Sequence, residues 1–176
     1  KPILKKIKIF RDEFLKLFFL GLTGCGICGA FPFIAGQTTT VVNMAVIYTS
    51  SPIFIILLSS LIYKEKIKLI QILGLILCLF GVFSIIFKGN VSILSNLDFT
   101  VGDIWMLGAA ISWALYSVYL LNWKSKFDLI TRFVLIAMFG SISLFPFYLF
   151  EEFQSQSTTF DLNFLFWVIF AAVSPA

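Results

Sequence analysis

The sequence predicts an all-α polytopic membrane protein, a helix bundle whose main solvent is lipid. Of its 176 residues 60% are hydrophobic and 12% are charged, whereas soluble domains carry about a quarter charged residues. The charged residues are also segregated, which leaves long uncharged runs at residues 17–63, 69–87 and 104–123. Each run reaches the length of about 20 residues that a membrane-spanning helix needs. The composition therefore excludes a water-soluble globular domain.

Six membrane-spanning helices are predicted from these runs. The first run is long enough for two helices and a turn, and none of the runs shows the strict alternation of a barrel strand. The predicted spans are residues 16–35, 39–62, 69–87, 102–122, 129–150 and 162 onward. Because the chain begins with Lys1 and the sixth span is short, we expect an internal fragment of a longer protein.

The basic residues predict how these spans are oriented. Twelve of the 13 Lys and Arg residues fall in alternate loops or at their edges, and Lys88 is the exception. Cytoplasmic loops of membrane proteins are enriched in basic residues. We therefore expect residues 1–16, 63–68 and 123–128 to be cytoplasmic in a cell (inner) membrane. The net charge of +4 follows from this topology and does not indicate nucleic-acid binding.

The first and third spans carry small residues, and their cysteines do not predict chemistry. Cys25 and Cys28 form a Cys-x-x-Cys pair inside the first span, where two buried structural thiols are a better interpretation than a redox pair. Gly21, Cys25, Cys28 and Pro32 fall on one stripe of the first span, and Gly74, Cys78 and Gly81 form a similar stripe on the third span. Both stripes predict helix packing. With no His, and with acidic residues only in loops and at span ends, we expect no enzyme, no metal site and no cofactor.

The second span is the most polar, and it contains a proline. Thr39, Asn43 and Ser50 lie on one side of the helical wheel, which favours either interhelical hydrogen bonds or the lining of a substrate path, with simple exposure at the membrane surface as a further interpretation for Thr39. Pro52 cannot donate a hydrogen bond to the carbonyl of Tyr48, so the helix should kink there. The kink is either structural or a hinge of the transport mechanism.

The fourth span has the clearest polar and aromatic stripe. Ser112, Trp113 and Tyr116 lie near its centre, too far from the membrane surface to be interfacial aromatic residues. Rings with polar tips suit a site for a small organic solute, although helix packing is the alternative interpretation. The fifth and sixth spans are apolar and add no candidate residues.

Several short segments of the sequence resemble those of a known family. The segments that carry the likeness are residues 48–54 (YTSSPIF), 64–66 (KEK), 73–74 (LG), 80–82 (FGV), 102–103 (GD) and 107–117 (LGAAISWALYS). They resemble the end of the first repeat and the start of the second repeat of the EamA family in the drug/metabolite transporter superfamily. The resemblance implies a ten-helix fold of two inverted five-helix repeats, of which this chain would hold helices three to eight.

The resemblance also implies domains and a function. Residues 1–87 would end the first repeat, 88–101 would be an extracytoplasmic linker, and 102–176 would start the second repeat. The implied function is a secondary carrier, an exporter of small organic metabolites that works by alternating access. Pro52 would be a gating kink and Glu65, otherwise a solvated loop charge, an anchor at the cytoplasmic end.

Two classes of function remain open from the sequence. The first is a carrier whose substrate path is lined by Asn43, Ser50, Ser112, Trp113 and Tyr116. The second is a membrane scaffold or assembly subunit that does not transport, which the small-residue stripes favour. The expected partners are a small-molecule substrate and the lipid bilayer, with a homodimer left open.

Overall fold

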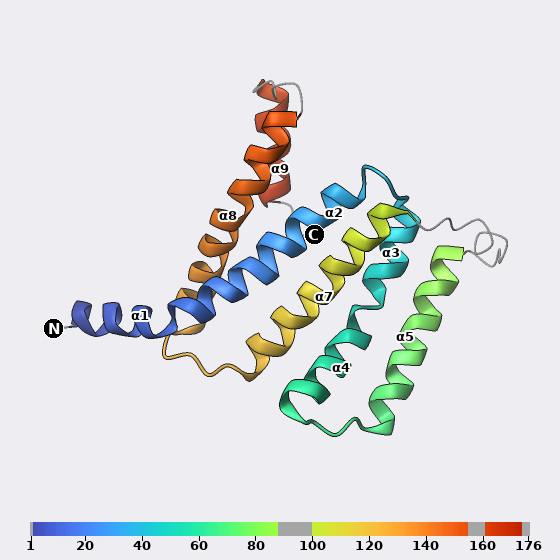
Figure 1. The fold of residues 1–176 in the computed structure, drawn as a ribbon, viewed down its shortest axis with the longest axis horizontal. Coiled ribbons are helices and arrows are strands. Elements are labelled where there is room, and N and C mark those ends of the chain that lie inside the picture. The colour runs from blue at the N-terminus through green and yellow to red at the C-terminus, as the bar shows by residue number, and fades with distance from the viewer. Residues whose placement is uncertain (1, 88–99, 155–160, 174–176) are drawn as a thin grey trace. The chain divides into compact units, whose positions relative to one another are not determined.

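A computed structural model describes residues 2–87, 100–154 and 161–173, and every regular element in these ranges is a helix. The elements are α1 (Pro2–Gly21), a short π-helix (Leu22–Ile27), α2 (Cys28–Ala35), α3 (Val41–Thr49), α4 (Ser51–Tyr63), α5 (Leu69–Phe87), α7 (Val101–Asn122), α8 (Leu129–Gln154) and α9 (Leu162–Val173) (Figure 1). The predicted all-α fold class is confirmed.

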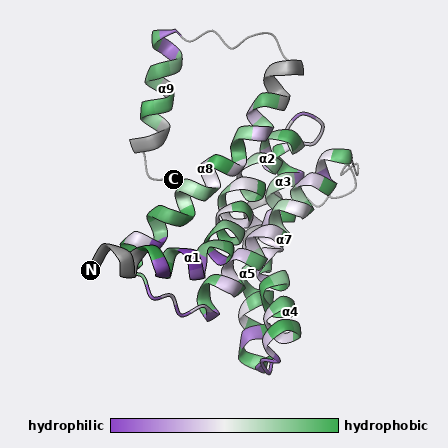
Figure 2. Ribbon diagram, turned by 60° about the vertical axis from the view of Figure 1, so that its left-hand side comes forward, coloured by the Kyte–Doolittle hydropathy of each residue, from purple (hydrophilic) through white to green (hydrophobic). Residues whose placement is uncertain are grey.

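The described helices include several that are suited to a bilayer. Four stretches are long and apolar enough to cross it: Ile7–Ala35, Val41–Tyr63, Val101–Asn122 and Leu129–Leu149. A shorter apolar helix, Leu69–Gly81, lies within α5. Figure 2 shows hydrophobic residues along most helices and hydrophilic residues in α1 and in the connections. This arrangement is that of a multi-pass membrane protein.

The chain divides into two compact units, and the boundary between them in the sequence falls within α8. The first unit extends to Leu144, and the second begins at Phe145 and contains the end of α8 together with α9. In the second unit the rings of Phe166 and Phe170 stack one helical turn apart, with their centroids separated by 6.2 Å. All of the contacts discussed below lie in the first unit.

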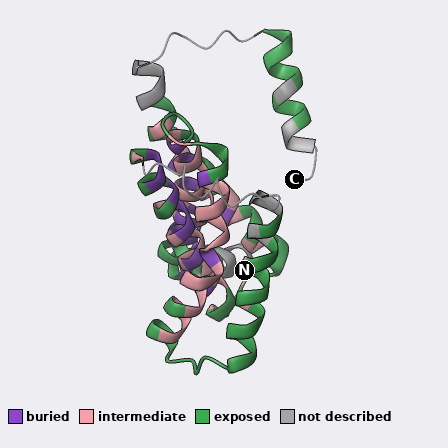
Figure 3. Cartoon of the chain, turned by 90° about the vertical axis from the view of Figure 1, so that its right-hand side faces the viewer, coloured by how far each residue is buried: buried purple, intermediate pink, exposed green. Residues whose placement is uncertain are grey.

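Helix α7 forms the centre of the first unit. It packs against α2, α3, α4 and the π-helix, and Figure 3 shows buried residues in the middle of the packed helices and exposed residues at their edges. The buried side chains of α7 are mainly small: Met106, Ala109, Ala110, Ser112, Ala114 and Val118. Small residues let helix backbones approach closely, and in lipid such packing holds helices together.

The small residues of the first span make close contacts, as their stripe predicted. At the end of α1, a Cβ placed on Gly21 would lie 2.8 Å from the backbone nitrogen of Gly140 in α8. A Cβ placed on Gly140 would lie 2.3 Å from the Cβ of Cys25. Cys25 and Cys28 are both free thiols. The stripe of the third span differs, since apart from the chain neighbours and the nearby backbone of α5 itself no atom of the described residues lies within 4 Å of a Cβ built on Gly74 or Gly81.

Two glycines provide a matched test of this packing. Gly140→Ala is expected to lower the free energy of unfolding by about 1–3 kcal/mol, because the new methyl group overlaps Cys25. A Cβ at residue 74 has open space around it. Gly74→Ala should therefore stabilise α5 by up to about 1 kcal/mol, since alanine is the better helix former. Thermal unfolding in detergent measures both variants, and equal shifts of the same sign would contradict the contact.

Candidate functional site

The second span is divided in two at Ser50. Helix α3 ends at Thr49 and α4 begins at Ser51, with Pro52 in the first turn of α4. The hydroxyl of Ser50 donates to the carbonyl of Ile47 at 2.5 Å, and its carbonyl accepts from the backbone N–H of Ile53 at 2.9 Å. Proline fits the first turn of a helix because the amide it lacks would have no intrahelical partner there. The chain can therefore bend at this point with little loss of hydrogen bonding.

A buried carboxylate ties α7 to the turn between α2 and α3. Asp103, in the first turn of α7, is 2% exposed. Its Oδ1 atom accepts from the Thr39 hydroxyl at 2.5 Å, and its Oδ2 atom accepts from the backbone N–H of Thr100 at 2.7 Å. The Asn43 side-chain amide lies 3.4 Å from both oxygens. We call Thr39, Asn43, Thr100 and Asp103 the Asp103 cluster.

At the same end of the bundle, the backbone at the start of α7 lies very close to the turn between α2 and α3. A Cβ on Gly102 would lie 2.5 Å from the carbonyl oxygen of Ala35 and 2.7 Å from the Thr38 hydroxyl. Only glycine leaves room for the start of α7 to lie against the turn at this distance. Together with the Asp103 cluster, this contact holds the start of α7 against the turn between α2 and α3.

A second buried carboxylate lies at the other end of α7. Glu13 of α1 is 6% exposed. Its carboxylate accepts from the Ser125 hydroxyl at 2.6 Å and from the backbone N–H of Lys126 at 2.9 Å. It therefore fixes the loop of residues 123–128, between α7 and α8, against α1.

The predicted path residues of the fourth span lie against the first span. The Ser112 hydroxyl, which is buried, donates to the carbonyl of Thr23 in the π-helix at 2.9 Å. The rings of Trp113 and Tyr116 are 5.3 Å apart, and both residues are half-buried. Tyr116 lies against Gly24, where a Cβ would be 2.5 Å from its ring. π-Helical turns are frequent at functional sites, and this one gives Ser112 and Tyr116 their partners.

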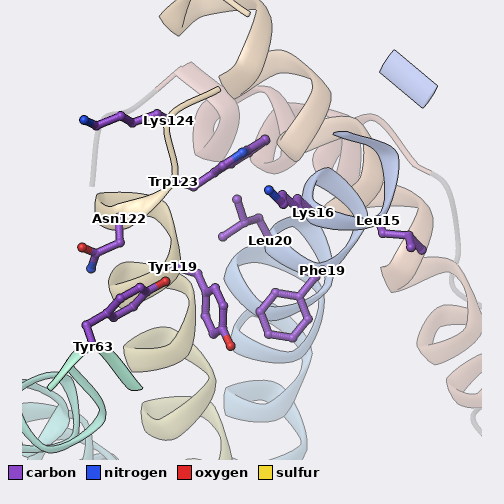
Figure 4. Close-up of a pocket in the computed structure, with 9 residues that line it drawn as sticks. All are labelled: Leu15, Lys16, Phe19, Leu20, Tyr63, Tyr119, Asn122, Trp123 and Lys124. Carbon is purple, nitrogen blue, oxygen red and sulfur yellow. The ribbon is translucent and has the colours of Figure 1, made fainter. Parts of the chain in front are cut away.

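A cavity of about 570 Å³ opens where α1, the end of α4 and the end of α7 meet. We call it the aromatic cavity (Figure 4). Its lining residues are Leu15, Lys16, Phe19, Leu20, Tyr63, Tyr119, Asn122, Trp123 and Lys124. The rings of Phe19 and Tyr119 meet edge to face at 5.1 Å, and those of Tyr63 and Tyr119 at 6.3 Å. A cavity with several aromatic side chains and a few polar groups is typical of a site for a small organic molecule.

The sequence-predicted residues do not line the aromatic cavity. Asn43 belongs to the Asp103 cluster, Ser50 lies at the helix break, and Ser112, Trp113 and Tyr116 face the first span or each other. Pro52 begins α4. Glu65 is exposed in the loop after α4 and accepts a hydrogen bond from the Ser59 hydroxyl, which holds the loop to the helix.

Sequence reasoning missed Asp103, Glu13 and the ring set of the cavity as site residues. Of these, Asp103 had a local signal, because Thr100-x-x-Asp103 ahead of an apolar run is a capping-box pattern. Glu13 had none, since its partners are more than 100 residues further along the chain. In the part of the chain that the structure describes, no group of three or more His, Cys, Asp or Glu residues is placed to hold a metal ion.

The sequence is similar to transporters. Residues 2–87 match the EamA-like transporter family. An uncharacterized transporter of Archaeoglobus fulgidus is 30% identical over 84% of this chain and 50% of its own length. The uncharacterized transporter YyaM of Bacillus subtilis is 28% identical over 61% of this chain and 35% of its own length. An uncharacterized transporter of Methanothermobacter thermautotrophicus is 32% identical over 70% of this chain and 36% of its own length.

These matches define what the chain is related to. It spans half or less of the length of these curated relatives, and no solved structure matches it significantly. The family and the relatives are named as transporters rather than enzymes. Over residues 2–87 the chain therefore matches the EamA-like transporter family, and over a longer stretch it is similar to transporters, as its sequence motifs indicated.

Proposed function

We propose that this protein is a secondary carrier that exports small organic metabolites by alternating access. The observation that carries the proposal is the asymmetry of the first unit along α7. The aromatic cavity opens at the end of α7, near Trp123, while the Asp103 cluster and Gly102 close the end where α7 begins. An alternating-access carrier is closed at one end while its site is open at the other.

The orientation and the domain organisation belong to the same proposal. Residues 1–16, 63–68 and 123–128 are proposed to be cytoplasmic in the cell membrane, because they carry most of the basic residues. The aromatic cavity, with Lys16 and Lys124 in its lining, then opens to the cytoplasm. Residues 1–87 and 102–176 are proposed as parts of two inverted repeats.

The substrate path is proposed to include the five residues selected from the sequence. Ser50, Trp113 and Tyr116 are half-buried, whereas Asn43 and Ser112 are buried and hydrogen-bonded. The break at Ser50 and Pro52 is the proposed hinge, because α4 can move relative to α3 there. Glu65 is the proposed anchor of the cytoplasmic loop.

Transport by the protein in proteoliposomes tests the function. Vesicles loaded with an isotope-labelled metabolite mixture should release at least one compound faster than protein-free vesicles, as measured by mass spectrometry of the external medium. The orientation is tested separately by labelling Asn122→Cys in a variant without its three native cysteines. A membrane-impermeant thiol reagent should modify it in inside-out vesicles but not in intact cells, and the opposite pattern would contradict the orientation.

An assembly subunit is the second candidate, and one observation favours it. The small-residue stripe of α5 has no described neighbour at Gly74 or Gly81, and such stripes pack against other helices. Absence of transport across the whole metabolite mixture, together with a stoichiometric partner that co-purifies, would support this candidate and contradict the carrier.

A further inference from the structure

The aromatic cavity has a composition that selects among ligands. Its four rings come from three elements: Phe19 from α1, Tyr63 from the end of α4, and Tyr119 and Trp123 from the end of α7 and the residue after it. Figure 4 shows Phe19, Tyr119 and Tyr63 arranged side by side across the cavity. Tyr63 and Tyr119 are 38% and 37% exposed. A solute can therefore reach these two residues, whereas it cannot reach the rings of a packed core. Rings presented in this way favour a flat apolar body.

The charged residues that line the cavity are all positive. Lys16 and Lys124 belong to it, and no carboxylate does. The Nζ atom of Lys16 lies 6.0 Å from the centre of the Trp123 ring, and in Figure 4 it points toward Trp123. The Arg132 guanidinium lies 5.9 Å from the same ring. This part of the cavity therefore has a positive potential.

The buried carboxylate on the same helix as Lys16 already accepts hydrogen bonds from other residues. Glu13, three residues before Lys16 on α1, accepts from Ser125 and from Lys126. Within the described part of the chain the structure gives Lys16 no ion pair. Lys16 is exposed, and an exposed cation beside aromatic rings, without its own counter-ion, can pair with an anion from outside.

We propose that the aromatic cavity binds an organic anion with an aromatic or other flat apolar body. The anionic group, a carboxylate or a phosphate ester, lies at Lys16, and the apolar body lies between Phe19, Tyr63 and Tyr119. An organic cation of the same shape is disfavoured by Lys16, whereas the amino group of Lys124 points away from the other lining residues (Figure 4). The inference rests on the proposed carrier function, since it names the class of substrate which that carrier takes up from the cytoplasm.

Binding to the protein in nanodiscs of zwitterionic phosphatidylcholine tests the inference. The probes are 3-phenylpropionate and phenethylammonium, which share a ring and differ in charge, and equilibrium dialysis measures both. We expect the anion to bind at least tenfold more tightly than the cation. Lys16→Gln should weaken binding of the anion by about tenfold or more, as expected for loss of one charge-assisted contact. Lys8→Gln, an exposed lysine of the same helix, should change it less than about twofold.

The source of the anion is distinguished by the lipid. In nanodiscs that contain phosphatidylglycerol, unchanged affinity for 3-phenylpropionate assigns the site to a soluble anion. Competition that disappears in Lys16→Gln assigns it to a lipid headgroup, and both results support an anion site at Lys16. Equal or tighter binding of phenethylammonium, or no effect of Lys16→Gln, would overturn the inference.

The carrier and its substrate class can fail separately. Release of organic cations from proteoliposomes, without binding of 3-phenylpropionate, would overturn the substrate class and leave the carrier intact. Binding that depends on Lys16 without any transport would uphold the anion site and overturn the carrier.

Discussion

Asp103→Ala is expected to reduce the free energy of unfolding by about 3–5 kcal/mol, because it removes several hydrogen bonds to a buried carboxylate at once. The carboxylate accepts from the Thr39 hydroxyl, the Thr100 backbone N–H and the Asn43 amide. Truncation leaves these donors without their acceptor, and a buried unsatisfied donor costs about 1–3 kcal/mol. Thermal unfolding in detergent measures the loss.

Two further variants test whether the loss of stability comes from the hydrogen bonds of the Asp103 cluster or only from the removal of a negative charge. Thr39→Val keeps the shape of the side chain but removes one donor, so it should cost about 1 kcal/mol. Asp12→Ala removes an exposed carboxylate of α1 and should change stability by less than about 0.5 kcal/mol. If Asp103→Ala unfolds at the same temperature as Asp12→Ala, the Asp103 cluster does not hold the bundle.

The same variant should also change which end of the protein is open. With the Asp103 cluster broken, the contact of α7 with the turn between α2 and α3 loses its hydrogen bonds, and only the approach of Gly102 remains. A cysteine at Ala35, which is buried and whose carbonyl oxygen lies against Gly102, should then react faster with a membrane-impermeant thiol reagent applied from outside the cell. An unchanged rate in a folded Asp103→Ala protein would contradict the role of the cluster in closing this end.

The spans could be predicted from the sequence because membrane insertion is governed by local composition. Charged residues flank the third predicted span on both sides, and the structure begins and ends α5 at the predicted residues 69 and 87. Pro52 is likewise a local signal, since its effect on the backbone depends only on its own ring and the preceding turn. These properties need no knowledge of which helices are neighbours.

The site could not be predicted in the same way because its contacts are distant in the sequence. Asp103 reads as a charge at the end of a span, and its burial depends on Thr39 and Asn43, which come some 60 residues earlier. The stripe containing Gly74 was predicted to pack against another helix, yet the described residues place no helix against it. A helical pattern tells which residues share a face, but it does not tell whether another helix covers that face.

Removal of the Glu13 carboxylate should loosen the opposite end of α7. In Glu13→Ala the Ser125 hydroxyl and the Lys126 backbone N–H lose their acceptor, which should cost about 2 kcal/mol. The loop of residues 123–128 contains Lys124 and Lys126, so trypsin reports on its opening. We expect cleavage after these lysines to accelerate by about tenfold or more, because proteolysis follows the population of the opened state.

Comparison with the Asp103 variant shows whether the two ends are independent. Asp12→Ala is again the control, since it removes a neighbouring exposed carboxylate of α1. If the loop is held locally by Glu13, Glu13→Ala should accelerate cleavage there, and Asp103→Ala should not do so under conditions in which it remains folded. If both variants accelerate cleavage equally, the two ends open together through α7. Opening of one end would then not be opposed by closure of the other, and the alternating-access proposal would be wrong.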